Sequence, residues 1–214
     1  MNLKNKDTWV IFCTGSSIKG RIEELEEHFK DWDNKIAVNS ARDYFSSEYW
    51  AFLDHIKECA KPSYQDRKII TSSSNREWIY RISNKIPIYA VMGETTTNSG
   101  IFAVKYAKEH GAKNIITCGL DLTDSWGHCD GVGTGQGKLE ITVEPSRPHS
   151  ECPPGLRSLV RTTIYQQEEK PKDKYAEMCR ESLNKLNNST GCTIYSVNKD
   201  NILDLKYYDT KGVE

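Results

Sequence analysis

The sequence predicts an α/β protein: a single Rossmann-like domain with a mostly parallel sheet, helices on both faces, and an inserted long loop or β-ribbon. Short apolar segments alternate with helix-like segments, which favours a parallel sheet covered on both sides. The 214 residues, 37% of them hydrophobic, suit one buried core. An irregular stretch rich in glycine and proline interrupts the pattern from residue 121 to 155. We therefore expect one domain over residues 1–214, with an insertion at about 122–170.

The N-terminal part predicts two strand and helix units. In the first, TWVIFC (Thr8–Cys13) is a buried strand, TGSS makes a tight turn, and the following helix has apolar residues at helical spacing: Ile18, Ile22, Leu25 and Phe29. In the second, KIAVNSA (Lys35–Ala41) is a buried strand. An aromatic-rich helix is expected after it, around Tyr49, Trp50, Leu53 and Ile56.

The rest of the chain continues this order on either side of the insertion. Strands are expected at RKIITSSS, IPIYAVMG, NIITCG and CTIYSV, and Pro87 favours a sheet edge for the second of these. Helices are expected over Ser99–His110, which ends at Gly111, and over KYAEMCRESLNKLNNSTG. Within the insertion, LEITVE and LVRTTIY alternate in polarity as antiparallel strands do.

Composition narrows the function classes. The formal net charge is −1, so no global basic field holds nucleic acid by charge alone. No segment reaches the roughly 18 apolar residues of a membrane span, and the start lacks a signal-peptide pattern, so we expect a cytoplasmic protein. The seven cysteines are scattered and odd in number, which favours reduced thiols that serve mostly as core residues.

Two polar turns are candidate phosphate sites. Gly15 permits a tight turn, and Ser16 and Ser17 stand where a helix exposes free N–H groups and its positive dipole end. The second turn consists of Thr97, Asn98, Ser99 and Gly100. Simple helix capping is the alternative for both turns, although the second holds more polar residues than a cap requires. In open α/β folds such turns meet at the carboxyl edge of the sheet, where ligands bind.

Polar residues at strand ends extend this candidate site. Asn39 follows the second strand, and Gly119 and Asp121 form the G-x-D ending of NIITCGLD. An acid at this edge contacts a ribose, a sugar hydroxyl or a metal, or else it is a structural aspartate that bonds turn amides. Both alternatives stay open for Asp121.

The insertion contains two histidine and cysteine pairs. His128 with Cys129 and His149 with Cys152 match no zinc spacing, so no metal site is expected. His149 is a candidate general base, because a histidine accepts a proton near neutral pH. A solvated loop histidine is the alternative.

Four segments in order resemble two related families. They are VIFCTGSSIKG, IAVNSA, SGIFAVKYAKEHGAKNIITCGLDL and ESLNKLNNSTGCTIYSVNKDNIL. The chain resembles the bacterial lipooligosaccharide sialyltransferases and the group that contains the archaeal 6-hydroxymethylpterin diphosphokinases, most specifically over Ser99–Asp121. The resemblance covers most of the chain except Asp124–Lys170. It implies a Rossmann-like domain that binds a nucleotide or nucleotide sugar, with Gly15–Ser17, Asn39 and the Ser99–Gly100 helix start near the donor.

The chain departs from this family pattern in several places. The glycine turn reads T-G-S-S instead of G-P-S. Thr96 or one of its neighbours stands where the sialyltransferases have an arginine that suits a sialate carboxylate, which argues against a carboxylated donor sugar. Thr123 replaces a tyrosine that touches phosphate, and Lys172–Tyr175 occupies the place of the family's catalytic histidine.

These features predict a glycosyltransferase that moves a sugar from a nucleotide-sugar donor to a hydroxyl acceptor. We expect no tightly bound cofactor, with magnesium only as a counter-ion of the nucleotide. The base is His149 or one of the carboxylates Asp121 and Asp124. The acceptor is a glycan, a small metabolite or a modified nucleic-acid base. Arg157 and Arg161 are candidate acceptor-binding residues, with a solvated strand face as their alternative.

Two other function classes stay open. Diphosphate transfer from ATP to a hydroxymethyl group, as the pterin relatives imply, needs magnesium on the nucleotide and a carboxylate such as Asp121, Asp124 or Asp130 to hold it. A non-catalytic nucleotide-binding protein would keep the crevice and lack the family's histidine.

Overall fold

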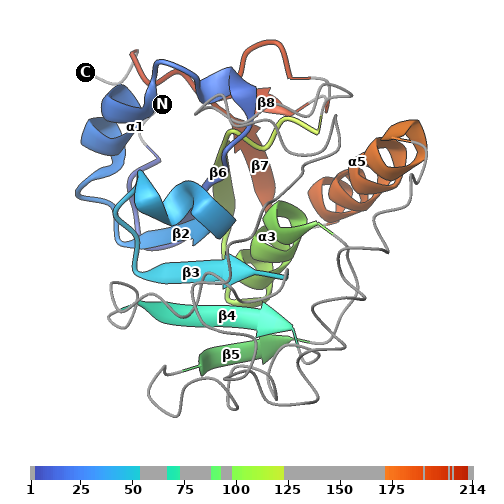
Figure 1. Cartoon of the computed structure of the whole chain (residues 1–214), viewed down its shortest axis with the longest axis horizontal. Coiled ribbons are helices and arrows are strands. Elements are labelled where there is room, and N and C mark those ends of the chain that lie inside the picture. Colours follow the sequence, from blue (N-terminus) through green and yellow to red (C-terminus); the bar gives the residue numbers. More distant parts are fainter. Residues whose placement is uncertain are drawn as a thin grey trace, which may run out of the picture.

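The computed structural model describes residues 3–53, 67–72, 88–92, 98–122, 172–189, 191–201, 203 and 205–211. Its strands are β1 (Thr8–Phe12), β2 (Asn34–Val38), β3 (Tyr49–Phe52), β4 (Lys68–Ser72), β5 (Ile88–Met92), β6 (Asn114–Cys118), β7 (Thr193–Ser196) and β8 (Lys206–Tyr207). They form one sheet in the order β5-β4-β3-β2-β1-β6-β7-β8 (Figure 1). Each neighbouring pair is parallel, which confirms the predicted α/β, Rossmann-like fold class.

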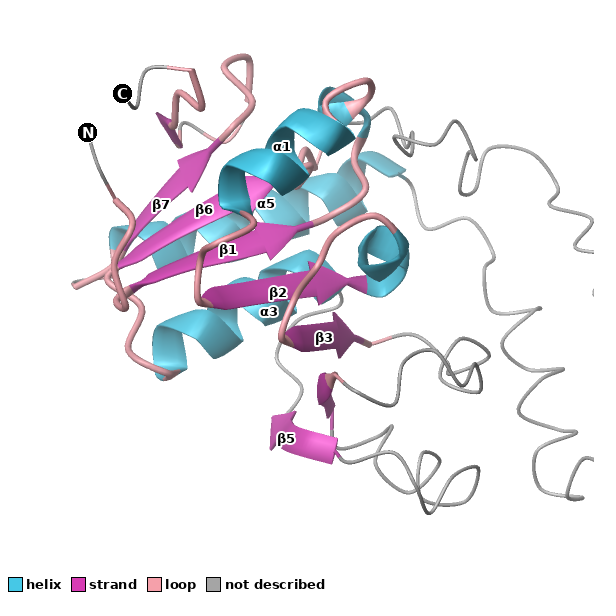
Figure 2. Ribbon diagram, turned by 90° about the vertical axis from the view of Figure 1, so that its left-hand side faces the viewer, coloured by secondary structure: helices cyan, strands magenta, loops and turns pink. Residues whose placement is uncertain are grey.

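Helices cover both faces of the sheet, as the sequence predicts. The α-helices are α1 (Ile22–Phe29), α3 (Ser99–Glu109) and α5 (Lys172–Asn188), and the 3₁₀ turns are η1 (Ser16–Ile18) and η2 (Asn39–Asp43). Figure 2 shows α1 on one face of the strands and α3 with α5 on the other. Right-handed crossovers require this arrangement, because the chain steps through the sheet in opposite directions before and after β5.

The residues of β1 divide the core between these two faces. Val10 and Phe12 pack with Leu25 of α1, whereas Trp9 and Ile11 belong to the cluster that contains residues of α3 and α5. All five strand residues of β1 are buried. A central parallel strand therefore reads as one continuous apolar run instead of an alternating one.

The order of the strands reverses beside β1. From β1 the chain builds the sheet outward through β2, β3, β4 and β5, and then returns through α3 to β6 on the other side of β1. The carboxyl ends of β1 and β6 therefore adjoin at a topological switch point. In open α/β sheets, ligands bind at such a point because the loops leave toward opposite faces.

One predicted helix is a strand. The segment Tyr49–Phe52 is β3, which pairs with β2 on one side and β4 on the other, and its four residues are all buried. A short apolar run satisfies helical and extended spacing equally well, so periodicity alone could not decide between them. Pairing with two neighbouring strands satisfies its backbone groups and decides the matter. Ile56, expected in the same helix, lies outside the described residues.

Apart from the helix expected directly after TGSS, the remaining predicted elements agree with the structure where it describes them. The strands at TWVIFC, KIAVNSA, RKIITSSS, IPIYAVMG, NIITCG and CTIYSV are β1, β2, β4, β5, β6 and β7. Among the described strands β5 lies at one end of the sheet, as Pro87 indicates. The sequence reading missed the two-residue β8. The predicted strands LEITVE and LVRTTIY lie outside the described residues.

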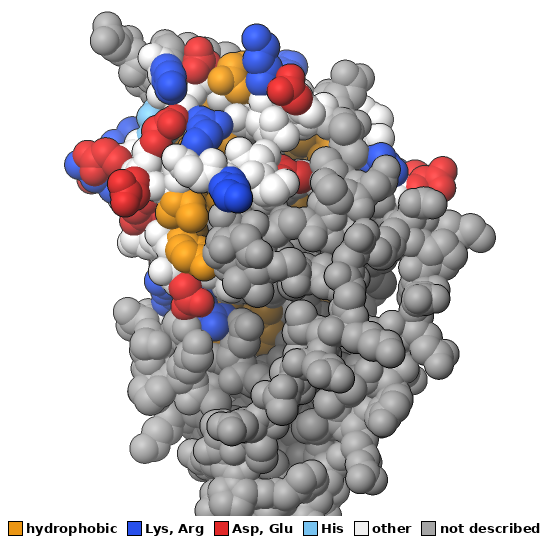
Figure 3. Space-filling view, turned by 45° about the horizontal axis from the view of Figure 1, so that its top comes forward, with side chains coloured by type: hydrophobic (Ala, Val, Ile, Leu, Met, Phe, Trp, Pro, Cys, Tyr) orange, Lys and Arg blue, Asp and Glu red, His pale blue; other side chains and the backbone are white. Residues whose placement is uncertain are grey.

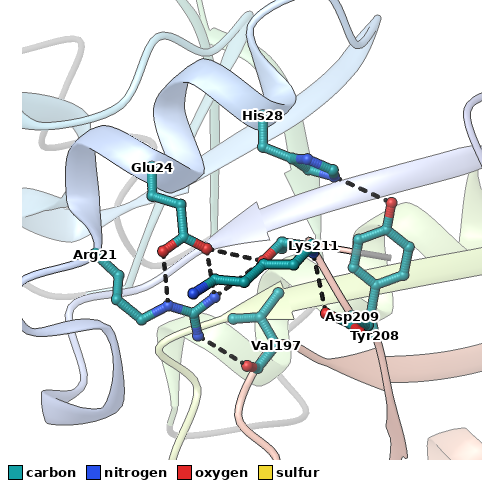
Figure 4. A network of polar contacts seen from close by, with 8 residues as sticks. Arg21, Glu24, His28, Val197, Tyr208, Asp209 and Lys211 are labelled. Atoms are coloured by element: carbon teal, nitrogen blue, oxygen red, sulfur yellow. Dashed lines mark hydrogen bonds and ion pairs between the residues drawn. The ribbon is translucent and has the colours of Figure 1, made fainter. Parts of the chain in front are cut away.

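The C-terminal segment packs back against α1 (Figure 4). Arg21 donates to the Glu24 carboxylate at 2.9 Å, to the Val197 carbonyl at 3.1 Å and to the Thr210 hydroxyl at 3.1 Å. The Thr210 hydroxyl in turn donates to Glu24 at 2.9 Å. These contacts join the first helix to the last described residues on the α1 face of the sheet.

Candidate functional site

The loops with predicted site residues meet at the carboxyl edge of the sheet. Phe12 at the end of β1 pairs with Ala37 of β2 on one side and with Cys118 of β6 on the other. The residues that follow these three strands therefore start at the same level. They include the predicted site residues Gly15, Ser16, Ser17, Asn39, Gly119 and Asp121.

The loops after β1 and β6 touch at the switch point. The Gly15 N–H donates to the Gly119 carbonyl at 2.9 Å. A Cβ atom on Gly15 would overlap this carbonyl oxygen and would lie 2.5 Å from Oδ2 of Asp121. Gly119 has a φ of +70°, which favours glycine. Glycine at both positions therefore allows an approach that any other residue would block.

Asp121 binds the turn that follows β1. Its Oδ2 accepts a hydrogen bond from the backbone N–H of Ser17 at 2.8 Å, and its Oδ1 accepts a short one from the Ser17 hydroxyl. Asp121 is buried, with 7% of its surface exposed. Of the two alternatives left by the sequence, these contacts correspond to the structural aspartate that bonds turn amides.

The serine turn is not the start of a long helix, which corrects the sequence prediction. Ser16 and Ser17 belong to the three-residue turn η1, and α1 begins only at Ile22, after Gly20 with a φ of +75°. The apolar spacing from Ile18 to Phe29 continues across this break, so periodicity could not reveal it. The free N–H groups of α1 therefore lie elsewhere, and the carboxylate of Asp121 already occupies the N–H of Ser17.

The start of α3 lies at the same edge, as predicted. Asn98 caps the helix, since its Oδ1 accepts from the N–H groups of Gly100 at 2.9 Å and Ile101 at 3.1 Å. The Ser99 hydroxyl accepts from the N–H of Leu53, just after β3, at 3.2 Å. These contacts are those of a helix cap and of an anchor to the end of β3. Thr97 lies outside the described residues.

The α3 start also contacts the switch point. A Cβ on Gly100 would lie 2.6 Å from the Leu120 side chain and 3.1 Å from the sulfur of Cys13. Cys13 is buried, and burial raises the pKa of its thiol well above the usual range, with a further increase from the nearby Asp121 charge. Cys13 therefore packs between the loops as a protonated, buried thiol.

Sequence reasoning missed two residues beside Asn39. Asn39 has a φ of 50°, and its carbonyl accepts from Trp50 Nε1 at 3.1 Å and from Arg42 at 3.3 Å. Trp50 was expected in a helix, so its approach to Asn39 across β2 and β3 was not foreseen. The available signal was an arginine within the turn that directly follows a buried strand.

Other predicted site residues lie outside the described residues. They are Asp124, His149, Arg157 and Arg161. Among the residues that the structure does describe, no group of three or more histidine, cysteine or acidic side chains is close enough to hold a metal ion. The four cysteines in that part of the chain, Cys13, Cys118, Cys179 and Cys192, are free and buried, as expected for core thiols.

The visible surface carries charges of both signs. Figure 3 shows lysine and arginine side chains interspersed with aspartate and glutamate over the described part of one face. This agrees with the nearly balanced composition. In the described ranges, no helix combines the length and apolar character needed to cross a bilayer.

Comparisons with known proteins give no relative. No family model, no curated protein and no solved structure matches the chain.

Proposed function

We propose that this protein is a transferase that binds a nucleotide sugar at the carboxyl edge of β1, β2 and β6 and moves the sugar to a hydroxyl acceptor. The observation that carries the proposal is the convergence of the loops after β1 and β6 with the α3 start at one switch point, beside the loop that follows β2 at the same edge. Open α/β sheets bind nucleotides at this place. The resemblance of the same segments to sialyltransferases favours a sugar donor.

Close packing of the loops at three glycines supports this assignment. Gly15, Gly100 and Gly119 each lie where an added Cβ would come within 3 Å of a neighbouring loop. Three close approaches at one edge bring the backbone of separate loops together. Because these loops are already fixed, their remaining polar groups can bind a ligand with little further loss of conformational entropy.

The described contacts favour different roles for the predicted catalytic residues. Both oxygens of Asp121 accept hydrogen bonds from Ser17, so in this proposal Asp121 organises the turn and does not take the acceptor proton. The base is then His149 or Asp124, from the insertion. Backbone amides and hydroxyls at the edge stabilise the departing phosphate as the acceptor hydroxyl attacks the anomeric carbon.

A thermal-shift screen tests donor binding. The panel holds CMP-, UDP-, GDP- and ADP-linked sugars and their free nucleotides, with and without magnesium. A true donor at 100 times its dissociation constant stabilises the folded state by about 2.7 kcal/mol. No shift with any member of the panel would refute the proposal.

A matched pair of glycine variants locates the site. Gly15→Ala places a methyl group against Asp121 at the carboxyl edge, whereas Gly111 lies before β6 at the opposite edge and has no atom within 4 Å of an added Cβ. We expect Gly15→Ala to lose the nucleotide-induced shift and Gly111→Ala to keep it.

Analysis of the released products separates the two enzyme classes. Release of AMP from ATP in the presence of a hydroxymethyl acceptor would identify a diphosphokinase, whereas release of a nucleotide from a sugar donor would identify a glycosyltransferase.

A further inference from the structure

Asn39 has an unusual backbone conformation for a residue with a side chain. Its φ of 50° lies in the left-handed region, which glycine enters freely and asparagine enters at a smaller cost than most residues. Such a conformation persists only where neighbouring groups hold it, and residues of this kind concentrate at binding and catalytic sites. Asn39 follows β2 directly and is partly exposed at the carboxyl edge.

Two buried side chains hold Asn39 by its carbonyl oxygen. The indole N–H of Trp50 donates to this oxygen at 3.1 Å, and the guanidinium of Arg42 donates to it at 3.3 Å. The guanidinium also lies over the Trp50 ring, 4.1 Å from its centroid, so the two donors stabilise each other by a cation–π contact. Both side chains are almost fully buried.

This arrangement is more elaborate than a turn requires. A glycine at position 39 would adopt the same φ with no donors on its carbonyl. Burial of an arginine is costly, and Asp43, whose carboxylate lies 3.7 Å from Nε of Arg42, is itself exposed to solvent. What asparagine adds over glycine is a carboxamide at the carboxyl edge of the sheet. Ala37 pairs with Phe12, and Asn39 and Thr14 each lie two residues beyond these partners.

We propose that Trp50 and Arg42 are positioning residues, which fix the left-handed turn so that the Asn39 carboxamide contacts a nucleotide bound at this edge. The inference rests on the proposed nucleotide-binding function. Trp50 and Arg42 then affect nucleotide affinity only through the position of the Asn39 side chain.

The test is a double-mutant cycle on nucleotide affinity, measured by calorimetry with CMP, UDP, GDP and ADP. Trp50→Phe removes the indole N–H and keeps an aromatic ring beneath the guanidinium. We expect it to weaken binding about tenfold, the size of one lost hydrogen bond. The control Trp32→Phe alters another buried tryptophan, in the α1-side cluster, and leaves affinity unchanged within about twofold.

The Asn39→Gly background separates positioning from general support of the fold. This variant lacks the carboxamide, and its backbone reaches φ 50° without help, so adding Trp50→Phe should cost no further affinity. An equal loss in both backgrounds would show that Trp50 only supports the fold, and an unchanged affinity of Trp50→Phe would also overturn the inference. If Trp50→Phe fails to fold, Arg42→Lys replaces it in the same cycle.

The outcomes also separate this inference from the proposed function. If no nucleotide binds the wild-type protein, the proposed function and the inference both fail. If a nucleotide binds wild type, Trp50→Phe and Trp32→Phe equally, the inference alone fails.

Discussion

Removal of the Asp121 carboxylate tests whether this residue organises the switch point. Asp121 accepts hydrogen bonds from both the N–H and the hydroxyl of Ser17 and is buried. A hydrogen bond to a charged group contributes about 1.5–3 kcal/mol, and a buried donor left without an acceptor adds its own cost. Because the two bonds share one carboxylate and are not additive, we expect Asp121→Ala to lower the free energy of unfolding by about 3 kcal/mol.

The isosteric variant Asp121→Asn provides the sharper comparison. Its amide oxygen still accepts from the Ser17 N–H, and its NH₂ group donates to the Ser17 oxygen if the hydroxyl rotates. The contacts survive without the charge, so we expect Asp121→Asn to lower the free energy of unfolding by about 1 kcal/mol. For a chain of this length, each kcal/mol lowers the melting temperature by roughly 2–4 °C. Asp121→Ala should therefore melt about 6–12 °C below wild type, as measured by calorimetry or circular dichroism.

A cycle with Ser17→Ala isolates the hydroxyl contact. This variant keeps the backbone N–H, so the coupling between Ser17→Ala and Asp121→Ala reports the side-chain bond alone, and we expect about 1–2 kcal/mol. An Asp121→Ala variant within about 0.5 kcal/mol of wild type would refute the organising role. So would an Asp121→Asn variant of wild-type stability whose transferase activity falls more than about 100-fold, because this pattern marks a general base.

Three further perturbations follow from the described contacts. Gly15→Ala should lower the free energy of unfolding by more than about 2 kcal/mol, because the methyl group meets the Asp121 carboxylate at 2.5 Å. Gly111→Ala adds only the strain of a side chain at a φ of +87°, about 1–2 kcal/mol. Urea unfolding measures both variants, and equal losses of stability would contradict the packing argument. Asn98→Ala removes the cap of α3 and should cost about 1 kcal/mol in the same assay, with Asn98→Asp as the control that keeps the acceptor. The hydrogen bond from Arg21 lowers the pKa of Glu24 to about 2, so its stabilisation is present above pH 4.5 and is lost as the pH falls toward 2. Because the Glu24 side chain is 37% exposed, the stabilisation by this ion pair is less than about 1 kcal/mol. Acid unfolding measures it, and a Glu24→Gln variant whose stability falls with pH as that of wild type does would contradict the prediction.

Local apolar runs and helix signals determined most of the elements of this protein. TWVIFC and NIITCG are strands because a parallel sheet buries both of their faces, and this requirement is visible as an uninterrupted apolar run. The helix after Ser99 is equally explicit, with polar residues before it and Gly111 after it. The carboxyl-edge grouping of Gly15, Asn39 and Gly119 also follows from sequence, because parallel strands end at one edge.

Tertiary structure decided the rest, because the deciding contacts join residues far apart in the chain. Tyr49–Phe52 is a strand since β2 and β4 supply its backbone partners, which its own spacing does not indicate. The acid of the G-x-D ending bonds a serine 104 residues away, so its candidate role depended on where β6 lies relative to β1. The hydrogen bond from Trp50 to Asn39 likewise forms only once β2 and β3 are paired.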